Sequence, residues 1–198
     1  MNFSSRHNFG LLHSHENGQE YLDYTGYMGG AVIGYHDKIG FPSMCYNAAN
    51  HWALGWYSDR AVATNLFRPT LIKLAAFADY DKTTAGEHYV VARTGNVYLH
   101  YNRAKGVNIN TYEYKDSLTI YQEISSGSYL FAALSWSGTK LYERTFSSGT
   151  WRAEICASVY GDNTSTPDYL VVSIGFGNSL CGAYAASPQT ALNTYRPL

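Results

Sequence analysis

The chain has 198 residues, a formal net charge of −1 at pH 7, 45% hydrophobic residues and 15% charged residues. This is the composition of an ordinary folded globular protein, and it excludes a disordered tail. Lysine and arginine form no run anywhere in the sequence and no apolar stretch is long enough for a membrane span, so neither a nucleic-acid-binding protein nor a membrane protein is indicated. The 19 tyrosines and 18 glycines favour strands and turns over long helices, so we expect a mainly β fold.

Residues 1–68 show no regular alternation, which predicts loops around one or two short helices. The best helix candidate is Tyr46–Trp56, where Asn47 can cap the N-terminus and Gly55 can end the helix. We expect Trp52 and Trp56, four residues apart, to form a core stripe on it. Residues 1–9 carry charge where a signal peptide would have its apolar stretch, so no signal peptide is expected in this chain.

Arg68-Pro69 marks a boundary, after which short apolar or alternating runs are separated by turn residues. We therefore divide the chain into residues 1–68 and a β-sandwich-like part, residues 69–198. The final residues from Ala183 show no period and predict an irregular tail. The expected strands are Leu71–Ala76, Tyr89–Arg93, Val97–Tyr101, Ser117–Gln122, Tyr129–Trp136, Trp151–Ser158 and Tyr169–Ile174.

Three cysteines are too few for a dense disulfide framework and their spacing fits no C-x-x-C metal site. Cys156 and Cys181 both lie in the strand-rich part, so we expect them to pair in an oxidising compartment and Cys45 to lack an internal partner. Three buried thiols are the equally open alternative. An N-glycosylation sequon begins at Asn163 and could be used only if the chain is exported.

The segment from His7 to His13 has the spacing His-x-x-Gly-x-x-His, with Gly10 at the glycine position. This is the second half of the pattern H-E-x-x-H-x-x-G-x-x-H, in which histidines from a helix and from the chain after a glycine turn bind zinc. A second match follows in Asp23–Gly29, a tight bend in which Met28 would lie beneath the metal as an apolar floor.

A third match begins at Cys45 and leads through an aromatic residue and Asn47 into a Trp-x-Leu-Gly-Trp helix end at Trp56. Together with the stretch Tyr101–Gly106, these motifs resemble the C-terminal part of gametolysin-like zinc metallopeptidases, relatives of the metzincins. The resemblance implies the C-terminal remnant of a catalytic domain in residues 1–68, with His7 and His13 as zinc ligands. It also implies an extracellular or cell-wall location and a matrix protein or glycoprotein substrate.

The sequence departs from that family where the motif should begin. Phe3 stands at the position of the first zinc histidine and Ser4 at the position of the general-base glutamate. Phenylalanine has no lone pair for zinc, and serine cannot accept a proton at neutral pH as a carboxylate does. We therefore expect no catalytic residue, weak or absent zinc binding and no peptidase activity in this chain, which reads as truncated. His15 and Glu16, the nearest substitutes for a missing ligand and a missing base, are expected to be solvated.

A second hypothesis is a non-catalytic β-sandwich module that binds matrix glycoprotein or carbohydrate. Aromatic residues on sheets can line a sugar-binding face. Against this, alternation in Val97–Tyr101 puts Tyr98 and His100 on one face and Leu99 and Tyr101 on the other, which indicates packing. His36, His51, His88 and His100 each stand alone and are expected to be surface or satisfied core residues.

Overall fold

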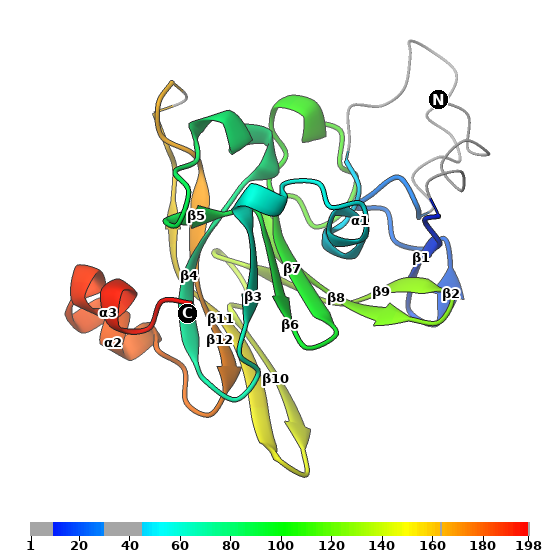
Figure 1. Ribbon diagram of the computed structural model, residues 1–198. Coiled ribbons are helices and arrows are strands. Elements are labelled where there is room, and N and C mark those ends of the chain that lie inside the picture. The colour runs from blue at the N-terminus through cyan, green and yellow to red at the C-terminus, as the bar shows by residue number, and fades with distance from the viewer. Residues whose placement is uncertain (1–9, 30–44, 163, 198) are drawn as a thin grey trace.

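The computed structural model describes residues 10–29, 45–162 and 164–197 (Figure 1). The expected mainly β fold is confirmed, since two sheets and a few short helices make up these residues. Three are 3₁₀ helices: η4 (Ser58–Arg60), η5 (Phe77–Lys82) and η6 (Gly106–Asn108). No helix in the described ranges is long and apolar enough to cross a lipid bilayer.

The first sheet has seven strands in the order β2-β1-β9-β8-β7-β6-β3. Its strands are β1 (His13–Glu16), β2 (Gln19–Glu20), β3 (Ala61–Thr64), β6 (Val91–Thr94), β7 (Val97–Asn102), β8 (Ser117–Ile124) and β9 (Gly127–Ser135). Strands β6 to β9 form an antiparallel meander, whereas β1 joins β9 and β3 joins β6 in parallel. Strands from before residue 69 thus share a sheet with strands from after it. The division of the chain into domains at residues 68 and 69 stays a prediction.

The second sheet has five strands in the order β10-β11-β12-β4-β5. Its strands are β4 (Thr70–Ala75), β5 (His88–Tyr89), β10 (Leu141–Phe146), β11 (Gly149–Val159) and β12 (Tyr169–Phe176). The expected strand Tyr89–Arg93 is divided at Val90, because the chain leaves the second sheet after β5 and enters the first sheet with β6. Four strands were not expected from the sequence: β1, β2, β3 and β10.

The main core lies between the two sheets. Alternate residues of β7 and β8, such as Leu99 and Ile120, pack against residues of β4 and β12, such as Leu74 and Val172. All four are at most 1% exposed. Side chains from facing sheets that interdigitate in this way define a sandwich, and each fully buried aliphatic side chain contributes about 1.5–3 kcal/mol.

Helices cover the outer faces of both sheets (Figure 1). Helix α1 (Ala48–Ala53) packs on the first sheet through Ala48 and Ala49, which contact the cluster that contains Tyr98 and Tyr121. Asn47 caps α1, since its Oδ1 accepts a hydrogen bond of 3.0 Å from the Asn50 amide. Trp56 lies beyond the end of α1 and is 45% exposed, so the expected core stripe is wrong for this residue.

The C-terminal segment is helical, not irregular as the sequence suggested. Helices α2 (Cys181–Ala186) and α3 (Pro188–Thr194) lie beside the second sheet, where Ala191 is buried against Leu71 and Val171. Cys181 at the start of α2 forms a disulfide with Cys156 of β11, and Cys45 is the free cysteine. Packing and this covalent link, which local periodicity does not reveal, account for the order of the segment.

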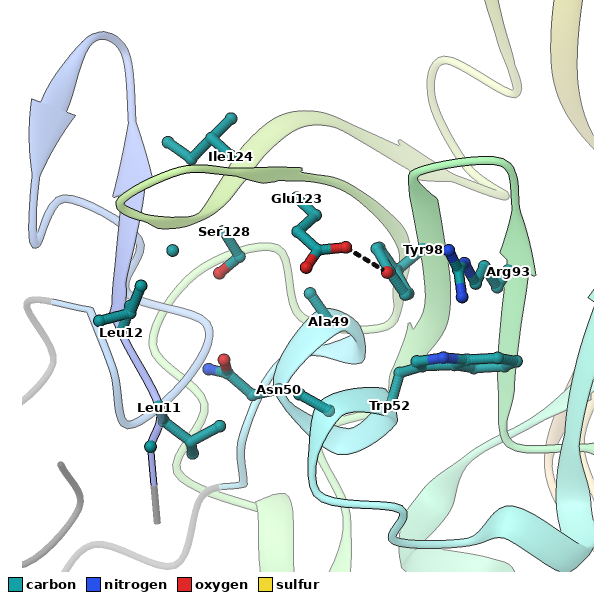
Figure 2. A pocket seen from close by; sticks show the side chains of 13 residues that line it. Leu11, Leu12, Ala49, Asn50, Trp52, Arg93, Tyr98, Glu123, Ile124 and Ser128 are labelled. Atoms are coloured by element: carbon teal, nitrogen blue, oxygen red, sulfur yellow. Dashed lines mark hydrogen bonds between the residues drawn. The ribbon is translucent and has the colours of Figure 1, made fainter. Parts of the chain in front are cut away.

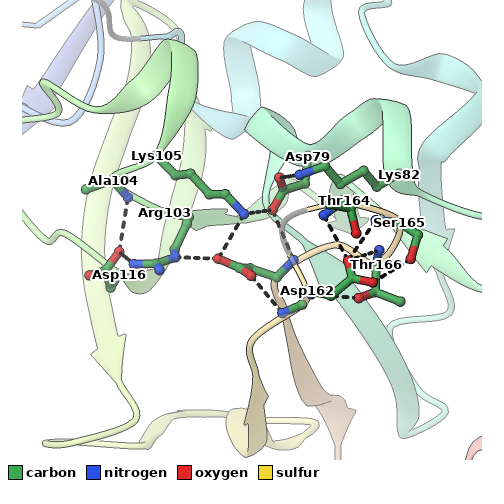
Figure 3. Close-up of polar contacts among 12 residues, drawn as sticks. Asp79, Lys82, Arg103, Ala104, Lys105, Asp116, Asp162, Thr164, Ser165 and Thr166 are labelled. Carbon is green, nitrogen blue, oxygen red and sulfur yellow. Dashed lines mark hydrogen bonds and ion pairs between the residues drawn. The ribbon is translucent and has the colours of Figure 1, made fainter.

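A cluster of ion pairs joins the ends of several strands (Figure 3). Asp79 of η5 is 1% exposed and accepts hydrogen bonds from Lys82 at 2.8 Å and Lys105 at 2.9 Å. Asp168, just before β12, accepts from Arg103 at 2.8 Å and donates its own amide to Asp79 at 3.0 Å. The family-like stretch Tyr101–Gly106 therefore supplies cations that neutralise two buried carboxylates, which is a structural role.

Candidate functional site

The described part of the segment with the motif matches begins at Gly10, which has a φ of +72° and no atom within 4 Å of the place where a side chain would start. The chain then enters β1, which carries His13, and returns as β2 through a two-residue turn at Asn17-Gly18. Both turn residues have positive φ, +50° and +74°, as a type I′ hairpin requires. His7, Phe3 and Ser4 lie outside the described residues.

His13 is held at both ring nitrogens. Its Nδ1 contacts the carboxylate of Glu20 in β2, and its Nε2 lies 2.7 Å from the hydroxyl of Tyr21. The rings of His13 and Tyr21 are 4.1 Å apart between centroids, and Tyr21 has a φ of +66°, a conformation that costs energy for an aromatic residue. A carboxylate on Nδ1 fixes the tautomer that leaves Nε2 unprotonated, so Nε2 accepts a hydrogen bond from the Tyr21 hydroxyl.

Met28 lies next to β1. Its carbonyl oxygen accepts a hydrogen bond of 2.8 Å from the Ser14 amide, which fixes the bend beside the strand of His13. The Met28 side chain is fully buried in a small cluster with Leu11 and Tyr46. Met28 is thus a buried apolar residue, and its backbone is hydrogen-bonded to Ser14, the residue that follows His13 in β1.

A buried carboxylate ties this bend to its surroundings. Asp23 is fully buried and accepts hydrogen bonds from the Ser14 hydroxyl at 2.5 Å, the Thr25 amide at 2.9 Å and Asn47 Nδ2 at 3.3 Å. Asn47 Nδ2 also donates to the Ser128 hydroxyl of β9 at 2.8 Å. Burial raises the pKa of Asp23, and these donors oppose that rise. The network connects β1, the Met28 bend, the start of α1 and β9.

His15 and Glu16 have different surroundings, and the expectation that both are solvated is wrong for Glu16. His13 and His15 share the partly exposed face of β1, while Ser14 and Glu16 point to the buried face. Glu16 is 7% exposed, accepts a hydrogen bond of 2.5 Å from the Tyr114 hydroxyl, and has a pKa raised by burial. Strand pairing that the sequence did not predict accounts for this burial.

The described residues alone do not form a zinc site. Among them, no group of three histidine, cysteine, aspartate or glutamate side chains lies close enough to hold a metal ion. His13 is the one predicted ligand that they include, and its Nε2 already has a protein partner. Its Nδ1 contact with Glu20 is of the outer-shell type that metal-binding histidines make, so this part of the arrangement suits a ligand.

Sequence reasoning missed Glu20 and Tyr21. The dipeptide Asn17-Gly18 is a strong hairpin signal, and it would have placed Glu20 opposite His15 and within diagonal reach of His13. The polar residues of β1 hid the strand, because two histidines, a serine and a glutamate do not alternate in hydrophobicity.

Comparison with known protein families gives a match in the N-terminal part of the sequence. Residues 2–80 match the family model described as Gametolysin peptidase M11, and this range contains the three motif matches, α1 and the chain as far as η5. No curated protein and no solved structure matches the chain. The resemblance to the gametolysin metallopeptidases is therefore confirmed over residues 2–80.

Proposed function

We propose that this chain is part of a zinc-dependent endopeptidase of the gametolysin type, which acts on proteins of the extracellular matrix or cell wall. His7 and His13 are its zinc ligands, with Gly10 as the turn between them and Met28 as the apolar floor. We further propose that the 198-residue chain alone does not hydrolyse peptide bonds, because Phe3 and Ser4 replace the first ligand and the general base.

The observation that carries the metalloenzyme proposal is the environment of His13. The Glu20 carboxylate on Nδ1 orients the imidazole as outer-shell carboxylates orient zinc-bound histidines, and Met28 packs beside the same strand. Tyr21 would have to release Nε2 when a metal binds there. The Cys156–Cys181 disulfide supports an oxidising compartment, as expected of an exported protein.

Zinc content tests this proposal without relying on activity. The purified chain, a His7→Ala/His13→Ala variant and a Phe3→His/Ser4→Glu variant are compared by metal analysis and zinc titration. The wild type and the double-alanine variant should bind zinc equally weakly, because two histidines are fewer ligands than a stable site needs. The Phe3→His/Ser4→Glu variant should gain stoichiometric zinc. Tight zinc binding by the wild type, or chelator-sensitive peptide hydrolysis by it, would show that the proposed inactivity is wrong.

The second candidate is a non-catalytic β module that binds matrix glycoprotein or carbohydrate. It is favoured by exposed aromatic side chains on the described surface, among them Tyr112, Trp136 and Tyr160, which are 58%, 40% and 62% exposed. Aromatic residues with one wet face are common at binding surfaces. Binding of purified matrix glycoprotein in the presence of a chelator would support this candidate over the peptidase.

A further inference from the structure

A pocket of about 340 Å³ lies between α1, the segment that precedes β1 and the ends of strands β6 to β9. Its size falls within the range of about 300–1,000 Å³ that is usual for small-molecule sites. Figure 2 shows Leu11 and Leu12 on one side and Trp52 with Arg93 on the other, with the Glu123 carboxylate above Ala49. No histidine of the described residues lines the pocket, so His13 is not part of its wall.

The pocket holds one acceptor and one cation that are only partly used. Glu123 Oε2 accepts a hydrogen bond of 2.6 Å from the Tyr98 hydroxyl, while its other oxygen has no partner in the described part of the chain. Arg93 donates from Nε to the Gly95 carbonyl at 2.7 Å, which leaves both Nη nitrogens unbonded among the described residues. One carboxylate and one guanidinium balance in charge, so the pocket does not select for an ion of either sign.

A buried amide adds a donor. Asn50 is 5% exposed and lines the pocket from α1, and its Nδ2 has no hydrogen-bond partner within the described residues. Buried polar groups are nearly always paired, so an unpaired amide at a pocket wall indicates that an oxygen from water or a ligand completes it. In Figure 2 this amide lies on the side of α1 that faces Leu11 and Ser128.

Aromatic rings form the rest of one wall. The Trp52 indole lies 6.0 Å from the Tyr98 ring between centroids, and the Arg93 guanidinium lies 5.5 Å from each ring centre. Arg93 thus fixes both rings through cation–π contacts. Burial, with the Glu123 hydrogen bond, raises the pKa of Tyr98 to about 12, so its hydroxyl stays protonated and continues to donate.

We propose that this pocket binds one neutral sugar unit of a glycan. A sugar ring offers adjacent hydroxyl groups that both donate and accept, which match the Glu123 oxygen, the Arg93 nitrogens and the Asn50 amide. Its C–H faces match the indole of Trp52 and the aliphatic side chains of Leu11 and Ile124. The proposal rests on the second functional candidate and names the site and ligand class for it.

An extended peptide fits this pocket less well. Strands β6 to β9 are each paired on both sides within the first sheet, so the pocket presents no free strand edge to a peptide backbone. Recognition must come from side chains, and side-chain hydrogen bonds beside an aromatic ring suit a polyhydroxylated ligand.

The experiment is an NMR titration of the full chain with the methyl glycosides of glucose, galactose, mannose and N-acetylglucosamine. Shifts of the Gly127 and Asn50 backbone amides report binding. Glu123→Gln keeps the shape of the side chain and its bond to Tyr98 but removes the charged acceptor, and Trp52→Ala removes the indole. Phe67→Leu, at an exposed aromatic residue that stacks on Phe176 with 5.7 Å between ring centroids, is the matched control outside the pocket.

At least one glycoside should bind saturably with a dissociation constant in roughly the millimolar range, and Glu123→Gln should weaken it about 10-fold or more. Phe67→Leu should bind as the wild type does. Absence of saturable shifts with all four glycosides overturns the proposal, as does binding that both Glu123→Gln and Trp52→Ala leave unchanged. If matrix glycoprotein binds wild type and Glu123→Gln equally, the second candidate stands and the pocket proposal fails.

Discussion

Two buried histidines should make this protein sensitive to acid. His51 of α1 and His100 of β7 are 0% and 1% exposed, and their ring centres are 6.3 Å apart. Apart from a weak contact of His51 with the Tyr46 backbone, their ring nitrogens have no hydrogen-bond partner within the described residues. Burial lowers the pKa of each imidazole to about 3, so both are neutral in the folded protein. The sequence-based expectation of surface or satisfied core histidines is therefore wrong for this pair.

The sign of the effect follows from the pKa difference. In the unfolded chain each histidine titrates near 6.5. Between pH 6.5 and about 3 the unfolded state therefore binds more protons than the folded state, and the free energy of unfolding decreases as the pH is lowered. At pH 5 each histidine lies about 1.5 units below its unfolded pKa, which corresponds to a loss of about 2 kcal/mol per histidine. Together they remove about 4 kcal/mol, a large part of the roughly 5–15 kcal/mol by which a domain is stable.

Urea unfolding followed by tryptophan fluorescence at pH 7 and pH 5 measures this loss. His51→Phe and His100→Phe should each reduce the difference between the two pH values by about 2 kcal/mol. Phe77→Leu is the matched control, because Phe77 packs against both imidazoles and carries no proton. It should lower the unfolding free energy equally at both pH values. Comparison of variants also cancels the opposite contribution of Asp23 and Glu16, whose pKa values burial raises. Histidine variants that keep the full wild-type loss would refute the reasoning.

Three further predictions concern stability. Asp23→Asn turns a buried acceptor of several hydrogen bonds partly into a donor and should cost about 2–4 kcal/mol in urea unfolding; a cost under about 1 kcal/mol would mean that the network is dispensable. Replacement of Cys156 and Cys181 by serine opens a link between positions 25 residues apart and should cost about 3 kcal/mol, visible as a lower urea midpoint that reducing agent no longer changes. Asp79→Ala leaves Lys105 beside an empty site and should cost about 3–5 kcal/mol by thermal unfolding, and an unchanged midpoint would contradict the buried ion-pair assignment.

The sequence predicted the strands that have an apolar face and a clear turn. Val97–Tyr101 alternates because Leu99 faces the core between the sheets and Tyr98 faces α1, and Gly95-Asn96 makes the preceding hairpin turn. Strand β10 escaped prediction because it is an exposed edge strand, with Leu141 and Phe146 39% and 44% exposed. Its pairing with β11 is a tertiary contact that local alternation does not encode.

For the candidate site, motif spacing identified His13, Gly10 and Met28 but not their neighbours. Spacing reports positions along the chain, whereas Glu20 reaches His13 through the register of a hairpin. Glu16 could not be recognised as buried, because its partner Tyr114 lies 98 residues away in sequence. The pocket beside Trp52 has the same origin, since its walls come from α1 and from four strands that meet only in the folded chain.

Strand β1 finds its parallel partner far along the chain, since Ser14 lies opposite Ser128, 114 residues later. Ribosomes add roughly 5–20 residues each second, so the segment that carries His13 leaves the ribosome about 6–23 s before β9 does. During that interval β1 can pair with β2 alone, and Ser14 and Asn47 lack the Ser128 hydroxyl that joins their network with Asp23 to β9. Gly127 then closes the register, because a side chain there would meet the His13 carbonyl oxygen at 2.0 Å. Docking of β1 onto the first sheet thus has to wait until β9 has been synthesised.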